Sequence, residues 1–154
     1  MKNIIKQITG IAIVLSLILA GCSGSDTDNA NSKSANKSKI SDFEMTHGIG
    51  PVTEEITIEE IDSELAKEGM RIFDMKCGAC HKLDKRYVGP PLGGVMNARS
   101  PAYVMNLILN TEEMLEKHPL AKSLDAEYPT RMTNQQLTRE KARAVVEYLA
   151  QESQ

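Results

Sequence analysis

The sequence predicts an all-α fold, a small helical bundle. Apolar residues recur at helical spacing in several stretches, and no alternating or β-branched run flanks the central cysteine motif. Aromatic residues are scarce, with two Phe, four Tyr and no Trp in 154 residues, so a macrocycle would help to fill the core. The length suits one domain. The formal net charge of −3 is too small to indicate a nucleic-acid partner.

The central motif is Cys77-Gly78-Ala79-Cys80-His81, a pattern typical of covalent haem c attachment. Two thiols at this spacing can both form thioethers with the vinyl groups of one porphyrin, and the imidazole that follows can bind its iron. A redox dithiol and half of a zinc site are the alternatives. The dithiol needs a βαβ context, and the zinc site needs a second ligand pair, which the remaining histidines, His47 and His118, do not supply.

The N-terminus predicts a lipoprotein. Residues 1–21 begin with positive charge and continue into an apolar run that is too short for a transmembrane helix. The run ends in Leu-Ala-Gly-Cys at Cys22, which resembles the lipobox of bacterial lipoproteins, where the cysteine becomes the acylated N-terminus. An uncleaved anchor and an ordinary signal with a stray cysteine are the alternatives. With Cys22 lipidated and Cys77 and Cys80 in thioethers, each cysteine has a role.

The rest of the chain divides by composition. Residues 22–41 are small and polar, and we expect a disordered linker between lipid and domain. Residues 42–56 form an N-terminal extension, and residues 57–152 form the folded domain. A helix is expected from Thr57, because Thr57-x-x-Glu60 matches a capping box, and this helix leads into the cysteine motif. Gly69 lies within it, which indicates a close helix crossing.

After His81, the segment Val88 to Gly94 holds two prolines and three glycines, so it is expected to be a constrained loop. The Pro90 carbonyl is well placed to accept a hydrogen bond from the His81 ring, as an iron-bound histidine usually requires. Ser100-Pro101 starts the next helix, and Thr111 starts a short one. One or two further turns follow within residues 121–128, and a final amphipathic helix is capped by Thr138.

This order of elements resembles a class I, mono-haem cytochrome c over about residues 57–151. The resemblance implies a close crossing of the first and last helices, which places Gly69 and Phe73 of the first against Tyr148 and Leu149 of the last. It also assigns roles beside the haem. The haem-binding residues that it implies, besides the motif, are Pro90 in the Gly-Pro loop, Leu92 against the haem, Arg99 near a propionate and Met132 as the second axial ligand.

Met132 lies just before the last helix, where the family carries its ligand, so the iron ligands implied are His81 and Met132. His118 is the strongest other candidate, whereas Met96 is too close to the proline loop. Met105 and Met114 fit helix interiors. The family often shows Met-Pro at this point, but here Thr133 follows, so the loop lacks the rigidity of a proline; side-chain hydrogen bonds from Thr130 or Asn134 could hold it instead.

The resemblance implies a single-electron carrier rather than an enzyme, with a redox protein as partner. Combined with Cys22, it predicts a domain held by lipid on a membrane of the bacterial cell envelope. A periplasmic terminal reductase or oxidase is the expected partner class, with nitrous-oxide reductase as a candidate. The alternative is a haem enzyme or gas sensor with an open distal site, similar to a small peroxidase. Five basic residues lie in sequence around the two segments expected to contact the haem: Lys76, Lys82, Lys85, Arg86 and Arg131. They either steer an acidic partner to the haem edge or only keep these loops soluble.

Overall fold

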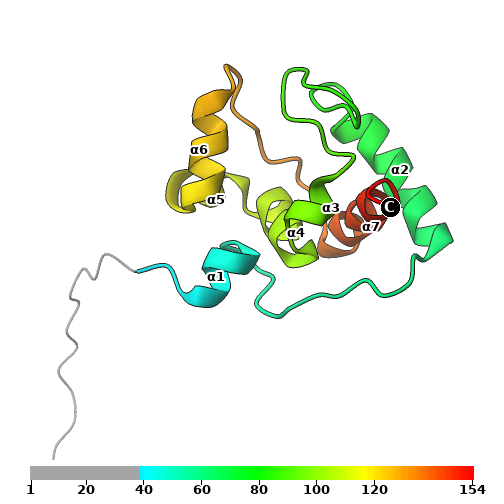
Figure 1. Cartoon of the computed structure of the whole chain (residues 1–154), viewed down its shortest axis with the longest axis horizontal. Coiled ribbons are helices and arrows are strands. Elements are labelled where there is room, and N and C mark those ends of the chain that lie inside the picture. Colours follow the sequence, from blue (N-terminus) through cyan, green and yellow to red (C-terminus); the bar gives the residue numbers. More distant parts are fainter. Residues whose placement is uncertain (1–38) are drawn as a thin grey trace, which may run out of the picture. The chain divides into compact units, whose positions relative to one another are not determined.

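The computed structural model describes residues 39–154, and over this range the regular secondary structure is entirely helical (Figure 1). The predicted all-α fold is therefore confirmed. The expected signal sequence, Cys22 and nearly all of the linker lie outside the described residues. None of the helices described is long and apolar enough to cross a membrane. In order they are α1 (Asp42–His47), α2 (Ser63–Lys76), α3 (Val95–Ala98), α4 (Pro101–Leu109), α5 (Thr111–Lys117), α6 (Pro119–Glu127) and α7 (Arg139–Gln151).

The crossing of α2 and α7 is the framework of the domain. At Gly69 a Cβ atom would lie 1.9 Å from the carbonyl oxygen of Ala144, so only glycine permits this approach of the two backbones. One turn further along, the rings of Phe73 and Tyr148 pack edge to face with their centroids 5.5 Å apart. The close crossing predicted through Gly69 is confirmed. It matters for function because α2 ends immediately before the cysteine motif.

Helix α2 begins later than the Thr57-x-x-Glu60 pattern predicted. Its N-cap is Asp62, whose carboxylate accepts hydrogen bonds from the amides of Glu64 and Leu65, both at 3.0 Å. The amide of Asp62 itself donates to the Glu147 carboxylate of α7 at 2.7 Å. Glu147 is fully buried. A long-range hydrogen bond therefore helps to fix the start of this helix, and the local capping pattern is not used.

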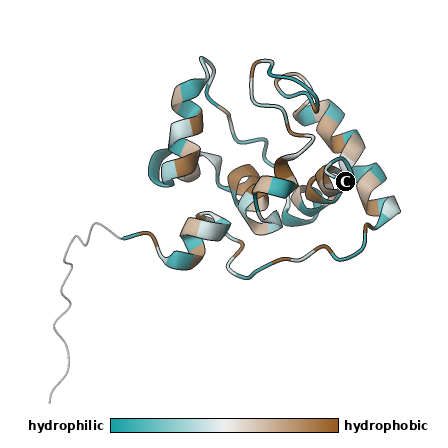
Figure 2. Ribbon diagram, viewed as in Figure 1, coloured by the Kyte–Doolittle hydropathy of each residue, from teal (hydrophilic) through white to brown (hydrophobic). Residues whose placement is uncertain are grey.

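Helix α4 is the most apolar part of the core (Figure 2). Its start is as predicted, because the Ser100 hydroxyl accepts from the amide of Tyr103 at 3.1 Å and Pro101 occupies the first turn. Thr138 caps α7 in the same manner. The most deeply buried hydrophobic residues come from α2, α4, α5, α6, α7 and the loop between α1 and α2. Those with at most 1% exposure are Val52, Ala66, Ala102, Met105, Met114, Ala121, Ala142, Ala144, Val145, Val146 and Leu149.

Residues 42–56, expected to be an extension before the domain, pack against it, and Ile49 and Val52 are buried in its core. Asn106 of α4 is fully buried, and its amide nitrogen donates to the carbonyls of His47, Gly48 and Val52 at 2.9 to 3.2 Å. Its amide oxygen accepts from the Val52 amide at 2.9 Å. One side chain thus forms hydrogen bonds with four backbone groups of a segment, and these groups would otherwise be buried without partners. The folded domain starts before residue 57.

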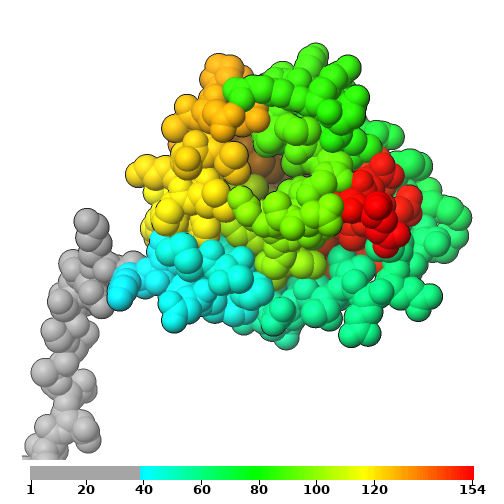
Figure 3. Space-filling model, in the orientation of Figure 1, coloured from blue at the N-terminus to red at the C-terminus, as the bar shows by residue number. Residues whose placement is uncertain are grey.

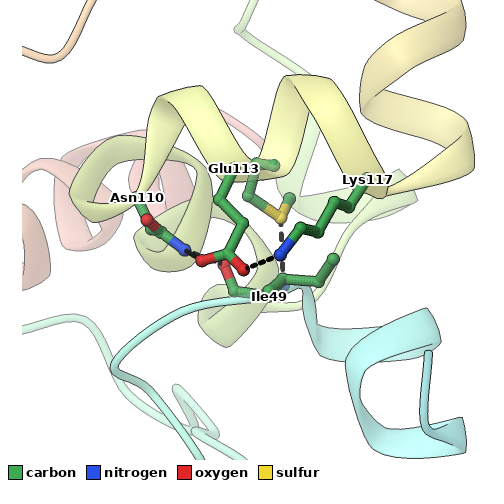
Figure 4. A network of polar contacts seen from close by, with 5 residues as sticks. Ile49, Asn110, Glu113 and Lys117 are labelled. Carbon is green, nitrogen blue, oxygen red and sulfur yellow. Dashed lines mark hydrogen bonds and ion pairs between the residues drawn. The ribbon is translucent and has the colours of Figure 1, made fainter. Parts of the chain in front are cut away.

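A second set of contacts holds the same segment against α5 (Figure 4). The amide of Ile49 lies 3.0 Å from the Met114 sulfur, and its carbonyl accepts from the Asn110 side chain at 3.1 Å. Asn110 also donates to Glu113 at 2.8 Å, and Lys117 pairs with Glu113 at 2.7 Å. These hydrogen bonds, first from Asn110 and then from Lys117, lower the pKa of the Glu113 carboxyl. Met114 is therefore a fully buried packing residue with a hydrogen-bonded sulfur.

Candidate haem site

The cysteine motif folds as a tight turn directly after α2. The amide of Cys77 donates to the Phe73 carbonyl at 2.8 Å, and the Cys77 carbonyl accepts from the amides of Cys80 and His81 at 3.0 and 2.8 Å. Both thiols are free. Cys80 is exposed and Cys77 is half-buried, and burial, with Cys80 beside it, raises the pKa of the Cys77 thiol to about 11. Two free thiols thus lie on one turn beside an imidazole.

The orientation of His81 suits an iron ligand. Its Nδ1 lies 3.0 Å from the Pro90 carbonyl oxygen, the contact predicted from the proline loop. A carbonyl can only accept, so Nδ1 carries the proton and Nε2 keeps its lone pair for a metal. Gly89 packs on the ring so closely that a Cβ there would lie 2.5 Å from Cε1. The imidazole is therefore held on two sides by the backbone of the following loop.

That loop is itself closed by hydrogen bonds back to the motif. The Gly89 amide donates to the Cys80 carbonyl at 2.8 Å, and the Leu92 amide donates to the Lys82 carbonyl at 2.9 Å. The Lys82 ammonium donates to the Gly78 carbonyl at 2.7 Å. Residues 77–93 consequently form one compact unit around the imidazole. Leu92, the expected haem contact, is half-buried and packs against the core.

A hollow in the surface lies between this loop, green in Figure 3, and the yellow and orange residues of α6 and the segment after it. Residues 128–138 connect α6 to α7 and run opposite the green loop (Figure 1). Met132 lies on this segment, half-buried and packed against the core cluster. The other methionine candidates differ, because Met105 and Met114 are buried inside helices at 1% and 0% exposure.

The segment that carries Met132 is shaped by its own side chains. The Asn134 carboxamide oxygen accepts from the Gln136 amide at 2.7 Å, and the Gln135 side chain donates to the Thr133 carbonyl at 2.9 Å. Gln136 has a φ of 54°, the left-handed region that non-glycine residues rarely adopt. Of the two residues considered for holding the loop, Asn134 forms a hydrogen bond, but only to Gln136 within the same segment, and Thr130 forms none within residues 39–154.

A cavity of about 430 Å³ is lined in part by Arg99, Tyr103, Met96 and Leu120. The Tyr103 hydroxyl is buried and has no hydrogen-bond partner within residues 39–154. The Arg99 guanidinium lies 5.8 Å from the centre of the Tyr103 ring. Burial raises the pKa of the Tyr103 hydroxyl, and Arg99 acts in the opposite direction. A phenol that lacks an acceptor and a guanidinium at one cavity fit a carboxylate ligand such as a haem propionate.

The two remaining histidines lie at α1: His47 is its last residue, and His118 contacts it from the start of α6. The Nδ1 atom of His47 lies 3.0 Å from the Ser100 hydroxyl, and its ring stacks on Phe43. His118 is buried at 1% exposure, and its Nε2 donates to the Met45 carbonyl at 3.2 Å. The His118 Nδ1 has no partner within the part of the chain that the structure describes. Sequence reasoning missed this packing role, because no local pattern marks it.

The family model of cytochrome c matches residues 66–153. The chain belongs to the cytochrome c family. Among solved structures, a cytochrome c from Rhodothermus marinus is 44% identical, with a TM-score of 0.68 over 71% of this chain and 95% of that one. An engineered form from the same organism is 43% identical, with a TM-score of 0.68 over 71% and 96% of the two chains. The engineered form bound to a carbene intermediate is also 43% identical, with a TM-score of 0.65 over the same shares. No curated protein matches.

Membership establishes a haem electron carrier of the mono-haem class, with one covalent haem c. The residues present fit that group. Two free thiols would form the thioethers, and the His81 Nε2 has the lone pair that the iron needs. At the Arg99 cavity, the Tyr103 hydroxyl has no hydrogen-bond partner within residues 39–154 and can donate to a carboxylate. When bound, the haem supplies one-electron redox chemistry at its iron.

The five basic residues near the haem segments are not equivalent. Arg86 pairs with Glu127, and Arg131 pairs with Asp125 at 3.0 Å, so acidic residues of α6 compensate both charges. Lys82 is turned inward onto a backbone carbonyl. Lys76 and Lys85 are exposed, with no ion-pair partner within residues 39–154. Net positive charge at this edge is therefore smaller than the count of basic residues indicates.

Proposed function

We propose that this cytochrome c carries single electrons at the outer face of a bacterial membrane, with His81 and Met132 as the axial ligands of its iron. The observation that carries the ligand assignment is the His81 ring, whose Nδ1 proton is bound to the Pro90 carbonyl and whose Nε2 is left for iron. Support for Met132 comes from its half-buried side chain on the segment opposite the proline loop, and from the buried helical positions of Met105 and Met114.

Two protein ligands distinguish a carrier from the alternative, a small haem peroxidase or gas sensor with an open distal site. A thioether in the sixth position favours ferrous iron and leaves no site for peroxide or carbon monoxide. The purified holoprotein should therefore be low-spin, should show the weak red-edge band of ferric iron bonded to a methionine sulfur, and should bind carbon monoxide slowly. A high-spin ferric spectrum with fast carbon monoxide binding would favour the open-site alternative.

We further propose that Cys22 is lipidated and tethers the domain to the membrane. The support is the sequence alone: the signal-like residues 1–21, the lipobox that ends at Cys22, and the small polar residues that follow. The wild-type protein should fractionate with membranes and require detergent for release. Cys22→Ala should yield a soluble or unprocessed form, whereas Ser23→Ala should behave as wild type. A wild-type protein that is released without detergent contradicts the anchor.

For the partner, we propose a terminal reductase or oxidase on the same side of the membrane, with nitrous-oxide reductase as the candidate to test first. The support is the resemblance of this small haem domain to carriers that serve such enzymes. The reduced protein should be reoxidised at a catalytic rate when purified nitrous-oxide reductase and nitrous oxide are both present. Reoxidation only by oxidase-containing membranes would assign it to a respiratory oxidase instead.

A further inference from the structure

Arg86 links the two sides of the haem hollow. It lies on the loop that follows His81, yet its guanidinium contacts the last residue of α6 and the residue after it. One nitrogen donates to the Glu127 carboxylate at 2.5 Å, and another donates to the Glu127 carbonyl oxygen at 2.9 Å. The guanidinium carbon lies 4.0 Å from the centre of the Tyr128 ring. We call Arg86, Glu127 and Tyr128 the Arg86 clasp.

The geometry suits a specific contact. The Glu127 carbonyl belongs to the last turn of α6, where carbonyls lack partners inside the helix and attract cations. The planar guanidinium binds the side-chain oxygen and the main-chain oxygen of one residue while its face stacks on the next ring. A lysine could not make these three contacts together. The rim of the hollow in Figure 3, where green and orange atoms meet, is consistent with this bridge.

Beyond the Arg86 clasp, the chain continues directly into the segment with Met132. Arg131, the neighbour of Met132, pairs with Asp125 of α6 at 3.0 Å. The start of the Met132 segment is thus attached to α6, and α6 is attached by Arg86 to the loop that holds His81. For Met132 to move away from the iron, we expect residues 127–131 to move with it, which breaks contacts to Arg86.

We propose that Arg86 is a positioning residue for the distal ligand, which acts by holding the Met132 segment to the proximal loop across the haem hollow. This inference rests on Met132 being the distal ligand, as proposed above. The Arg86 clasp slows release of the sulfur from the iron and so preserves the closed, electron-carrying form. The side chains of Arg86 and Glu127 are 52% and 54% exposed, so salt should weaken their ion pair while the stacking on Tyr128 persists.

The test is ligand exchange on the ferric holoprotein with excess imidazole, followed by loss of the red-edge band. Arg86→Ala should raise the imidazole binding rate between about threefold and tenfold, the range expected for a partly exposed ion pair with a stacking contact. Arg86→Lys should recover only part of the wild-type rate, and Glu127→Gln should have a smaller effect because the main-chain carbonyl remains. Added salt should accelerate exchange in wild type more than in Arg86→Ala.

Arg71→Ala is the matched control, because Arg71 forms an exposed ion pair with Glu68 within α2 and makes no contact with the Met132 segment. It should leave the exchange rate unchanged. If the wild-type protein shows the red-edge band and Arg86→Ala exchanges imidazole at the wild-type rate, Met132 remains the ligand but the proposed positioning role of Arg86 is wrong. Equal acceleration in Arg71→Ala also overturns it. A wild-type protein without the band overturns both the proposed Met132 ligation and this inference.

Discussion

The two sides of the haem site are built in different ways. On the proximal side, backbone groups hold the ligand: the Cys77 carbonyl accepts from the His81 amide at 2.8 Å, and the Pro90 carbonyl lies 3.0 Å from the His81 ring. On the distal side, residues 129–137 form no backbone-to-backbone hydrogen bond with any other residue in 39–154. Side-chain contacts attach that segment instead, namely the ion pair of Arg131 with Asp125 and the packing of Met132 and Leu137 against the core.

This difference indicates which side of the iron is expected to open. Backbone hydrogen bonds within one short loop are hard to break singly, because each is supported by its neighbours in the chain. A segment held by individual side chains can detach with the loss of a few weak contacts. With Met132 as the proposed sixth ligand, we therefore expect the proximal side to determine whether haem is bound at all, and the distal side to determine whether the sixth position stays closed.

The largest expected effect is on haem attachment, which proximal substitutions should reduce and a distal substitution should not. Cys77→Ala, Cys80→Ala and His81→Ala should each lower the yield of holoprotein by about tenfold or more, because haem attachment and folding of this aromatic-poor core are coupled. Met132→Ala should keep its covalent haem. The measurement is covalently bound haem per protein after denaturation. A double cysteine variant that retains covalent haem would contradict the proximal assignment.

The helix that delivers the motif can be disturbed without touching the ligands. Gly69→Ala places a Cβ 1.9 Å from the Ala144 carbonyl oxygen, and the two helices must separate. We expect a loss of about 3 kcal/mol in the free energy of unfolding, measured by denaturant titration. Gly94→Ala is the control, because a Cβ there meets nothing within 4 Å. It should change the stability by less than about 0.5 kcal/mol.

Met132→Ala tests the distal side directly. Loss of the sulfur should open the iron, give a high-spin or water-ligated ferric form and lower the reduction potential by on the order of 100 mV. Spectra in the red-edge region and a potentiometric titration measure both effects. Met96→Ala is a suitable control, because Met96 is also half-buried but lies at α3. Should the band survive in Met132→Ala, another residue is the ligand.

The smallest effect should come from Asn134→Ala, which removes the hydrogen bond to the Gln136 amide. The loss of one exposed hydrogen bond is about 1 kcal/mol. We expect the red-edge band to disappear at a lower temperature than in wild type while the helical signal melts nearly as before. Asn97→Ala also removes one exposed side-chain hydrogen bond, to the Ser153 carbonyl, but it should leave the temperature dependence of the band unchanged.

The sequence by itself determined the fold class and the haem motif, and it predicted His81 as the proximal ligand. It also predicted the caps at Ser100 and Thr138, the hydrogen bond from His81 to Pro90 and the close crossing at Gly69. The caps and the hydrogen bond to Pro90 depend on groups close together in the chain. Chemistry at such short separations leaves a pattern that can be read directly.

Only the tertiary structure decided how distant segments combine. The start of α2 is helped by a hydrogen bond from Asp62 to Glu147, groups 85 residues apart, and this contact prevailed over the local capping pattern at Thr57. The docking of residues 42–56 depends on Asn106, an ordinary-looking polar residue in an apolar helix. The charge of Arg86 is compensated by Glu127, 41 residues away. Such pairs leave no periodic or spacing signal in a single sequence, because their partners become neighbours only when the helices pack.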